Sequence, residues 1–414
     1  MISYNLRRLL CPLAIVILFS FLIVMKLFNN TLNSHQLPLA EIVAISPPPL
    51  TFEQLEASIE NLLDPQSSSK SHQHSWNNLM SLWKYKLSIF MRDSCQLCDA
   101  NRTECYETVN IDKYVSSVND TYYPRIPIPY VNGIGLYYYF DMQLKALNNS
   151  ILSVDTTQCD YFHMIQLMIN IQIILYDANI KHFLTKGTLI GTLRHHDVIP
   201  WDTDIDLFIP AYTTKKLLKM FHLLDVRFTT TVLPSTSYTN DLIIYPFRNI
   251  YRVTSYKIFS SRSKQVNGTK YRWPKIDLFP YYENKTHLSA YPKHRHNLGT
   301  MDYILKSKVY PTYLRPLGPL LVPSPYDPKV SLKAMVKLGS NIFYACEGNT
   351  FLHRENRRST ETWRLPCKEL RDSYPLVNSQ YDQHRNICTE TLLYQKKVLS
   401  MFKYKCKENL NRTL

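Results

Sequence analysis

The sequence predicts a mixed α/β or α+β domain, because helical and strand patterns alternate between residues 155 and 340. Apolar residues recur at helical spacing after Asp160, a residue type that caps helices. The segment 204–209 first alternates polar and apolar residues and then turns apolar, as a strand entering a core does. Helices are expected at 160–176, 212–224 and 331–338, strands at 182–186, 204–209, 251–259 and 275–281, and a turn leading into a helical turn at 187–193. Helices and strands that mix in this way indicate the α/β or α+β class.

Composition limits the possible partners. The chain has 414 residues, 45% of them hydrophobic, which is enough for a sizeable core. Its formal charge is +15, but the Lys and Arg residues are scattered, whereas a nucleic-acid interface gathers them on one face. We therefore expect no nucleic-acid partner, and an anionic substrate or membrane instead.

The N-terminus predicts a membrane anchor. Residues 9–25 are apolar apart from Ser20, and Arg7 and Arg8 precede them, which predicts a cytoplasmic N-terminus. A cleavable signal peptide would need small residues after the apolar run, and residues 26–28 are Lys, Leu and Phe. The prediction is a single-pass type II protein of the Golgi or ER membrane whose catalytic part is luminal.

Sequons and cysteines agree with a luminal location. N-x-S/T sequons begin at Asn29, Asn101, Asn119, Asn148, Asn267, Asn284 and Asn411. Besides Cys11 in the apolar segment, the chain contains Cys95, Cys98, Cys105, Cys159, Cys346, Cys367, Cys388 and Cys406. An even number of luminal cysteines predicts disulfides, although Cys95, Cys98 and Cys105 could hold zinc instead. The predicted organisation is a cytoplasmic tail at 1–8, a transmembrane helix at 9–28, a stem at 29–75, a cysteine-bearing region at 76–154, a catalytic domain at 155–340 and a disulfide-tied C-terminal appendage at 341–414.

Three aspartates at alternate positions are the strongest chemical signal. Asp204 and Asp206 stand two residues apart at the start of a predicted strand, so their carboxylates point to the same face. Like charges at close range are costly without a cation, and oxygen ligands suit Mg²⁺ or Mn²⁺. An EF-hand starting at Asp202 is excluded, because its sixth and twelfth positions hold Leu207 and Thr213. The D-x-D motif of nucleotide-sugar glycosyltransferases usually ends a strand, whereas these acids begin one.

A further acid, a glycine and a threonine complete the candidate site. Asp277 lies in a short apolar strand, where it either joins the metal site or pairs with Lys275 or Arg272. Gly187 and Thr188 follow a predicted strand, where backbone N–H groups can approach a phosphate.

These segments resemble the LicD/fukutin family. The resemblance rests on Gly187–Gly191, Arg194-His195, Ile199–Asp206, Tyr251–Val253, Ile276–Pro280 and Arg315–Gly318, and it covers roughly residues 160–340. It implies a nucleotidyltransferase-like mixed sheet flanked by helices, and transfer of phosphocholine or ribitol phosphate from a CDP-activated donor to a glycan or glycoprotein. It also implies that Asp204, Asp206 and Asp277 are the metal ligands.

The expected mechanism assigns a role to each residue. Asp202, Asp204, Asp206 and Asp277 are the predicted catalytic set, with Mg²⁺ or Mn²⁺ neutralising charge on the phosphoryl oxygens and Asp202 as general base or supporting group. Gly187, Thr188, Arg194 and His195 are the predicted substrate-binding residues; Arg194 either binds phosphate or pairs with an aspartate, and His195 and His196 are structural or substrate-facing. A sugar-transferring glycosyltransferase and a catalytically silent luminal binding protein are the alternatives.

Overall fold

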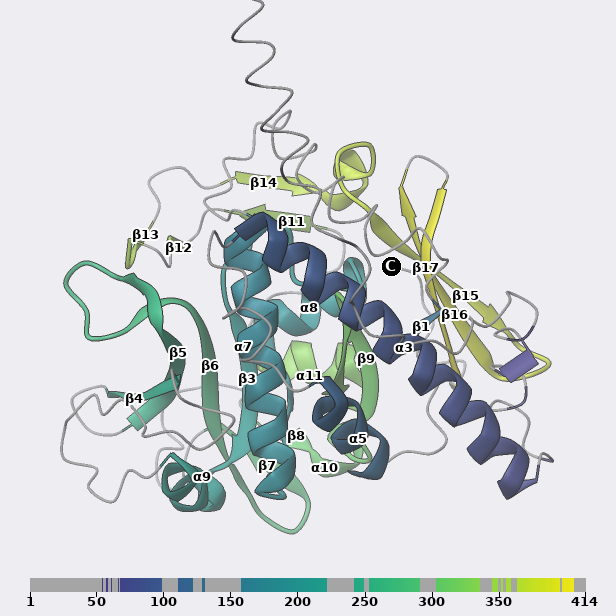
Figure 1. Ribbon diagram of the computed structural model, residues 1–414, viewed down its shortest axis with the longest axis horizontal. Coiled ribbons are helices and arrows are strands. Elements are labelled where there is room, and N and C mark those ends of the chain that lie inside the picture. Colours follow the sequence, from purple (N-terminus) through teal and green to yellow (C-terminus); the bar gives the residue numbers. More distant parts are fainter. Residues whose placement is uncertain are drawn as a thin grey trace, which may run out of the picture. The chain divides into compact units, whose positions relative to one another are not determined.

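The computed structural model describes most of the C-terminal two thirds of the chain and two helices before it (Figure 1). The described residues are 54, 57–58, 61, 66, 68–98, 111–121, 129–130, 158–221, 242–248, 253–290, 303–335, 345–348, 351–352, 355–358, 363–394 and 397–405. All of them belong to one compact unit, Leu50–Leu414. Among them no helix has the length and apolar character needed to cross a bilayer. The predicted anchor at 9–28 and the possible zinc ligands Cys95, Cys98 and Cys105 lie outside the residues or side chains described.

A mixed β-sheet forms the centre of this unit. Its strands run in the order β2 (Phe183–Leu184), β3 (Ile205–Pro210), β6 (Arg272–Glu283), β5 (Val253–Gln265) and β4 (Leu242–Arg248). The β3–β6 pair is parallel, whereas β2–β3, β5–β6 and β4–β5 are antiparallel. Two short strands, β7 (His287–Ser289) and β8 (Tyr303–Leu305), continue from β6. The sheet confirms the predicted mixed α/β class.

Helices cover this sheet because their faces are apolar. The helix α7 (Gln158–Asp177) packs against β6, and α3 (Ser69–Cys98) and α5 (Ile111–Thr121) pack against α7 (Figure 1). The Tyr114 hydroxyl on α5 donates a 2.7 Å hydrogen bond to Gln172 Oε1 on α7, so both polar groups are satisfied in the core. Further helices in the described part of the chain are α8 (Lys186–Arg194), η1 (Ala211–Thr213), α9 (Thr214–Met220), α10 (Lys306–Val309), α11 (Pro328–Met335) and η4 (Cys367–Leu370).

The predicted elements are found with shifted ends. The helix expected at 160–176 is α7, and the strands expected at 204–209 and 275–281 are β3 and a longer β6. The strand expected at 251–259 is β5, which runs to Gln265. The turn leading into a helical turn that is expected at 187–193 is a longer helix, α8, of nine residues. The helix expected at 212–224 is the shorter pair η1 and α9. The proline-rich segment also contains a hairpin, β9 (Tyr313–Leu317) and β10 (Leu320–Ser324).

The C-terminal region is a set of small antiparallel sheets. Strand β11 (Ala345–Gly348) pairs with β14 (Trp363–Pro366), and β12 (Phe351–Leu352) pairs with β13 (Arg357–Arg358). The other strands follow the order β1 (Pro129–Tyr130), β17 (Lys397–Lys405), β16 (Ile387–Tyr394) and β15 (Leu376–Asp382). A disulfide joins Cys346 to Cys367, which confirms that this region is disulfide-tied. Cys388 is also disulfide-bonded.

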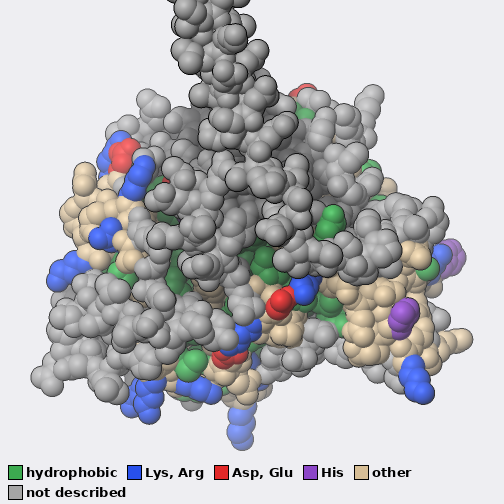
Figure 2. Space-filling view, in the orientation of Figure 1, with side chains coloured by type: hydrophobic (Ala, Val, Ile, Leu, Met, Phe, Trp, Pro, Cys, Tyr) green, Lys and Arg blue, Asp and Glu red, His purple; other side chains and the backbone are tan. Residues whose placement is uncertain are grey.

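Charged side chains are dispersed on the face shown in Figure 2. The described Lys and Arg residues there lie at several separate places rather than in one patch. The expectation that no nucleic acid binds stays a prediction.

Candidate metal and phosphate site

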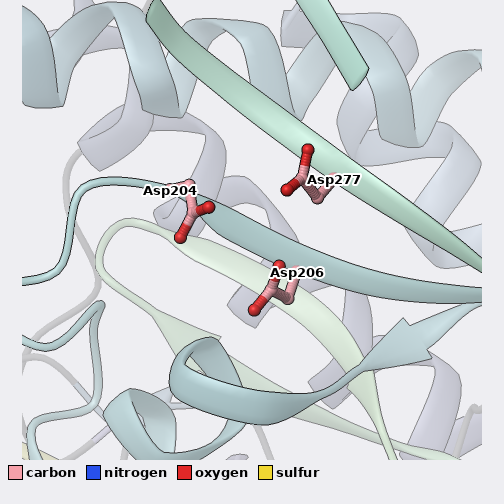
Figure 3. Close-up of side chains that lie close together, drawn as sticks. All are labelled: Asp204, Asp206 and Asp277. Atoms are coloured by element: carbon pink, nitrogen blue, oxygen red, sulfur yellow. The ribbon is translucent and has the colours of Figure 1, made fainter. Parts of the chain in front are cut away.

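Three aspartates meet where β3 and β6 run parallel. The register pairs Asp206 with Asp277 directly, and Asp204 immediately precedes β3 (Figure 3). One carboxylate oxygen from each of the three lies within 4.8 Å of the others. The predicted set of Asp204, Asp206 and Asp277 is therefore brought together by strand pairing, although Asp206 and Asp277 lie far apart in the sequence.

Two buried lysines share this cluster. Lys275 Nζ lies 2.6 Å from Asp204 Oδ2 and 3.1 Å from Asp277 Oδ2. Lys257 Nζ, from β5, lies 3.0 Å from both Asp277 oxygens. The sequence offered Lys275 or Arg272 as an alternative partner for Asp277; Lys275 does contact it, while Arg272 Nη1 donates to the carbonyl of Ser263. Asp277 thus belongs both to the acid cluster and to an ion-pair network.

Burial and mutual repulsion shape the electrostatics. Burial, together with the charges of Asp204 and Asp277, raises the pKa of Asp206 to about 7 against the opposing effect of Lys186. Burial and the charges of Asp204 and Asp206 also raise the pKa of Asp202 well above its usual value. Burial lowers the pKa of Lys275, but the carboxylates of Asp204 and Asp277 outweigh it and raise that pKa above its usual value. The acids therefore favour an added cation or a proton.

The donor set fits a hard divalent cation. All three candidate ligands are carboxylates, the oxygen donors that Mg²⁺ and Mn²⁺ prefer. The cluster lies beside the first turn of α8, where backbone N–H groups have no partner within the helix. The carboxylates can hold a cation, and the backbone N–H groups at the start of α8 can bind an anionic phosphate from the other side.

Gly187 and Thr188 lie in the first turn of α8 and shape the cluster from that side. A Cβ atom on Gly187 would overlap Oδ2 of Asp202, so only glycine leaves room for that carboxylate. The Thr188 hydroxyl oxygen accepts a 2.8 Å hydrogen bond from the backbone N–H of Asp206. Thr188 therefore positions Asp206, and the phosphate contacts expected of Gly187 and Thr188 stay predictions.

Arg194 and His195, at the other end of α8, face the C-terminal region. Arg194 Nη1 donates to the sulfur atoms of Cys346, at 2.9 Å, and Cys367, at 3.2 Å. His195 is 0% exposed, and its Nδ1 lies 2.8 Å from the carbonyl of Pro375. Burial and the nearby Arg194 lower the pKa of His195 to about 3, so its ring is neutral. In the described part of the chain both residues contact protein groups, and their substrate-binding roles stay predictions.

The next residues, His196 and Trp201, are also held by the C-terminal region. His196 Nδ1 lies 2.9 Å from Ser400 Oγ, and its Nε2 lies 3.2 Å from Glu390 Oε2. Trp201 Nε1 donates a 2.7 Å hydrogen bond to the carbonyl of Glu347. The segment that leads into Asp202 is thus anchored at both ends.

Lys257 and Glu390 are the residues that sequence reasoning missed. Lys257 stands inside the apolar strand predicted at 251–259, where a buried charge needs a partner, so the argument applied to Asp277 could have found it. Glu390 forms an ion pair with Arg315 and accepts a 2.9 Å hydrogen bond from the Tyr404 hydroxyl. The sequence around Glu390 does not mark it in this way, because Arg315 and His196 come from distant parts of the chain.

Comparisons with known proteins agree with this geometry. Residues 179–327 match the family model described as LicD/FKTN/FKRP, nucleotidyltransferase domain. An uncharacterized protein of Rickettsia typhi is 25% identical over 169 residues, which are 39% of this chain and 42% of that protein. The alignment therefore spans less than half of the relative. The matched segment contains the acid cluster, both lysines and α8, and residues 179–327 are accordingly a nucleotidyltransferase domain of the LicD/FKTN/FKRP family.

Proposed function

We propose that this protein is a Mg²⁺- or Mn²⁺-dependent transferase. It moves a phospho-alcohol group, such as ribitol phosphate or phosphocholine, from a CDP-activated donor to a hydroxyl of a glycan or glycoprotein. The observation that supports this most strongly is the cluster of Asp204, Asp206 and Asp277 inside the nucleotidyltransferase domain. Three carboxylates so close together are costly unless a cation joins them.

The chain's own residues would bind and orient the reactants. Asp204, Asp206 and Asp277 would hold the divalent ion, which would neutralise charge on the phosphoryl oxygens. The first turn of α8 would direct backbone N–H groups and the positive end of its dipole toward the donor's diphosphate. Thr188 would keep Asp206 in place through its backbone hydrogen bond.

Asp202 is the proposed general base. Its raised pKa makes its carboxylate a stronger proton acceptor than an ordinary aspartate. The acceptor hydroxyl would lose its proton to Asp202 while its oxygen bonds to the distal phosphorus of the donor. The bond from that phosphorus to the bridging oxygen would break, and CMP would leave.

Substitution of the acids tests this proposal. Asp206→Asn and Asp277→Asn each remove one charge with little change in shape, and each should slow CMP release at least about 100-fold, because even outer-shell partners of a metal cost 10–100-fold. Asp382→Asn, at an exposed acid, is the matched control and should leave the rate unchanged. Phosphorus from the donor should appear on the acceptor. An acceptor that gains a sugar without phosphorus would support the glycosyltransferase alternative, and absence of metal-dependent nucleotide binding would support the silent binding protein.

We further propose that this chemistry takes place in the lumen of the Golgi or ER, with the membrane anchor at 9–28. Two sequons, at Asn267 and Asn284, lie at exposed positions where a glycan can be attached. Glycosidase treatment of the membrane-bound protein should lower its apparent mass. Asn267→Gln and Asn284→Gln should each remove part of that shift, and an unglycosylated protein after secretory expression would contradict the location.

A further inference from the structure

The ammonium group of Lys275 lies between two of the proposed metal ligands. Its Nζ contacts Asp204 Oδ2 at 2.6 Å and Asp277 Oδ2 at 3.1 Å, and the side chain is only 1% exposed. Lys275 comes from β6, two residues before Asp277, so the same strand supplies one acid and one cation to the cluster. A positive charge is therefore built into the site at hydrogen-bond distance from the carboxylates.

Lysine ammonium groups already contact half of the carboxylate oxygens of Asp204, Asp206 and Asp277. Asp277 accepts from Lys257 through both oxygens and from Lys275 through Oδ2, and Asp204 accepts from Lys275 through Oδ2. A two-metal site needs carboxylates that serve both ions, which lie about 3.5–4 Å apart. Because Lys275 already contacts Oδ2 of both Asp204 and Asp277, those two oxygens are less available to a second divalent ion.

The buried ion pairs of Lys275 with Asp204 and Asp277 are hard to explain by stability of the fold alone. Removing charged groups from water carries a large desolvation penalty, and apolar residues of similar volume often stabilise a fold as well or better. Lys257 adds a second buried cation, whose ammonium also lies 4.8 Å from the ring centroids of Phe247 and Tyr271. Its two contacts with Asp277 fix the orientation of that carboxylate, so Lys257 is a positioning residue.

From these contacts we propose that Lys275 takes the place of the second metal ion of a two-metal site. The chain binds one divalent cation at Asp204, Asp206 and Asp277, and the Lys275 ammonium supplies the second positive charge to the donor's phosphate. This inference rests on the proposed transferase function. It adds a specific cation count and a specific role for one residue.

Manganese binding to the full chain tests the cation count. Free Mn²⁺ is measured by electron paramagnetic resonance during a titration in the presence of CDP, and the wild type should bind one Mn²⁺ per chain. Lys275→Met removes the charge while keeping an unbranched side chain, and it should bind a second Mn²⁺ and show the broadened signal of two coupled ions. Lys257→Met should still bind one Mn²⁺, and Lys270→Met, at an exposed lysine, should match the wild type.

The outcomes separate this inference from the function on which it rests. A wild type that binds two coupled Mn²⁺ ions and still releases CMP would overturn the role of Lys275 and leave the transferase intact. A wild type that binds no Mn²⁺ would overturn both. A folded Lys275→Met variant that still binds one Mn²⁺ would also refute the substitution of lysine for metal. If that variant fails to fold, the wild-type count alone decides.

Discussion

The backbone N–H of Asp206 donates a 2.8 Å hydrogen bond to the side-chain oxygen of Thr188. On the other side of the same residue, the Asp206 carbonyl accepts a 3.1 Å hydrogen bond from the backbone N–H of Thr185. The N-cap residue and the first turn of α8 therefore together hold the backbone of a proposed metal ligand through both of its polar groups. This attachment makes the position of Asp206 depend on a residue that carries no charge.

Thr188→Val should separate that positioning role from the chemistry. Valine keeps the shape but leaves the buried Asp206 N–H without its partner, which should lower the free energy of unfolding by about 1–3 kcal/mol. CMP release should fall as well, and Thr188→Ser should restore both. Thr192→Val is the matched control, because the Thr192 hydroxyl donates to the carbonyl of Leu189 within the same helix. Urea denaturation and CMP assays measure the two effects; equal losses in both valine variants would contradict the prediction.

Gly187→Ala should affect activity, whereas Gly191→Ala should affect stability. The new Cβ at position 187 meets the Asp202 carboxylate, which can move, whereas the one at 191 meets the backbone of Asp197 and Ile199, which cannot. Gly187→Ala should therefore fold and lose CMP release, and Gly191→Ala should be strongly destabilised. Adding Asp202→Ala to Gly187→Ala removes the overlap and should restore thermal stability without restoring turnover. If Gly187→Ala released CMP at the wild-type rate, the position of the Asp202 carboxylate would not matter for turnover.

The protonation of Asp206 should make stability depend on pH. Its pKa rises from 3.8 to about 7 in the folded chain, chiefly through burial. A raised folded pKa favours folding below pH 3.8, and this contribution is lost as pH rises through about 7. In a chelator, the wild type should therefore lose melting temperature relative to Asp206→Asn between pH 4 and pH 8. Added Mg²⁺ should stabilise the wild type more at pH 8 than at pH 5, because metal competes with the proton; a gain independent of pH would contradict this.

The Cys346–Cys367 disulfide should stabilise the fold and the segment before Asp202 together. It closes a loop of 21 residues, for which chain entropy predicts about 3 kcal/mol of stabilisation. The Cys346→Ala/Cys367→Ala variant should lose about that much and also remove the sulfur acceptors of Arg194. The ring of Trp201 packs 4.9 Å from that of Trp363, so near-ultraviolet circular dichroism should report the loosening. An unchanged spectrum and unchanged unfolding would contradict the prediction.

The acid cluster could be predicted because its signals are local. Ile-Asp-Leu-Phe occurs at 205–208 and again at 276–279, and the two copies pair residue by residue in β3 and β6. Alternation placed Asp204 and Asp206 on one face, and burial of Asp277 in an apolar strand demanded a partner. The sequence argument assumes that the two strands are neighbours, and the structure shows that they pair.

Contacts between distant segments could not be predicted in this way. The contact of His196 with Glu390 spans 194 residues, and neither residue has neighbours in the sequence that indicate the other. The helix α3 is a different case, because Trp76, Leu79, Met80, Trp83, Leu87, Phe90 and Met91 recur at helical spacing and are buried. That periodicity is present in the sequence, so this helix of the cysteine-bearing region could have been predicted from it.

The contacts between residues 194–201 and the C-terminal region bear on the order in which the chain can fold during its synthesis. Arg194, His195, His196 and Trp201 are held by groups between Cys346 and Ser400. A ribosome that has finished the family domain at residue 327 has not yet made any of these partners. Until residues 346–400 have been synthesised, the side chains of Arg194, His195, His196 and Trp201 lack these partners. We therefore expect the segment that precedes Asp202 to reach its final packing only after residues 346–400 have been made, which is later than the synthesis of Asp204, Asp206 and Asp277.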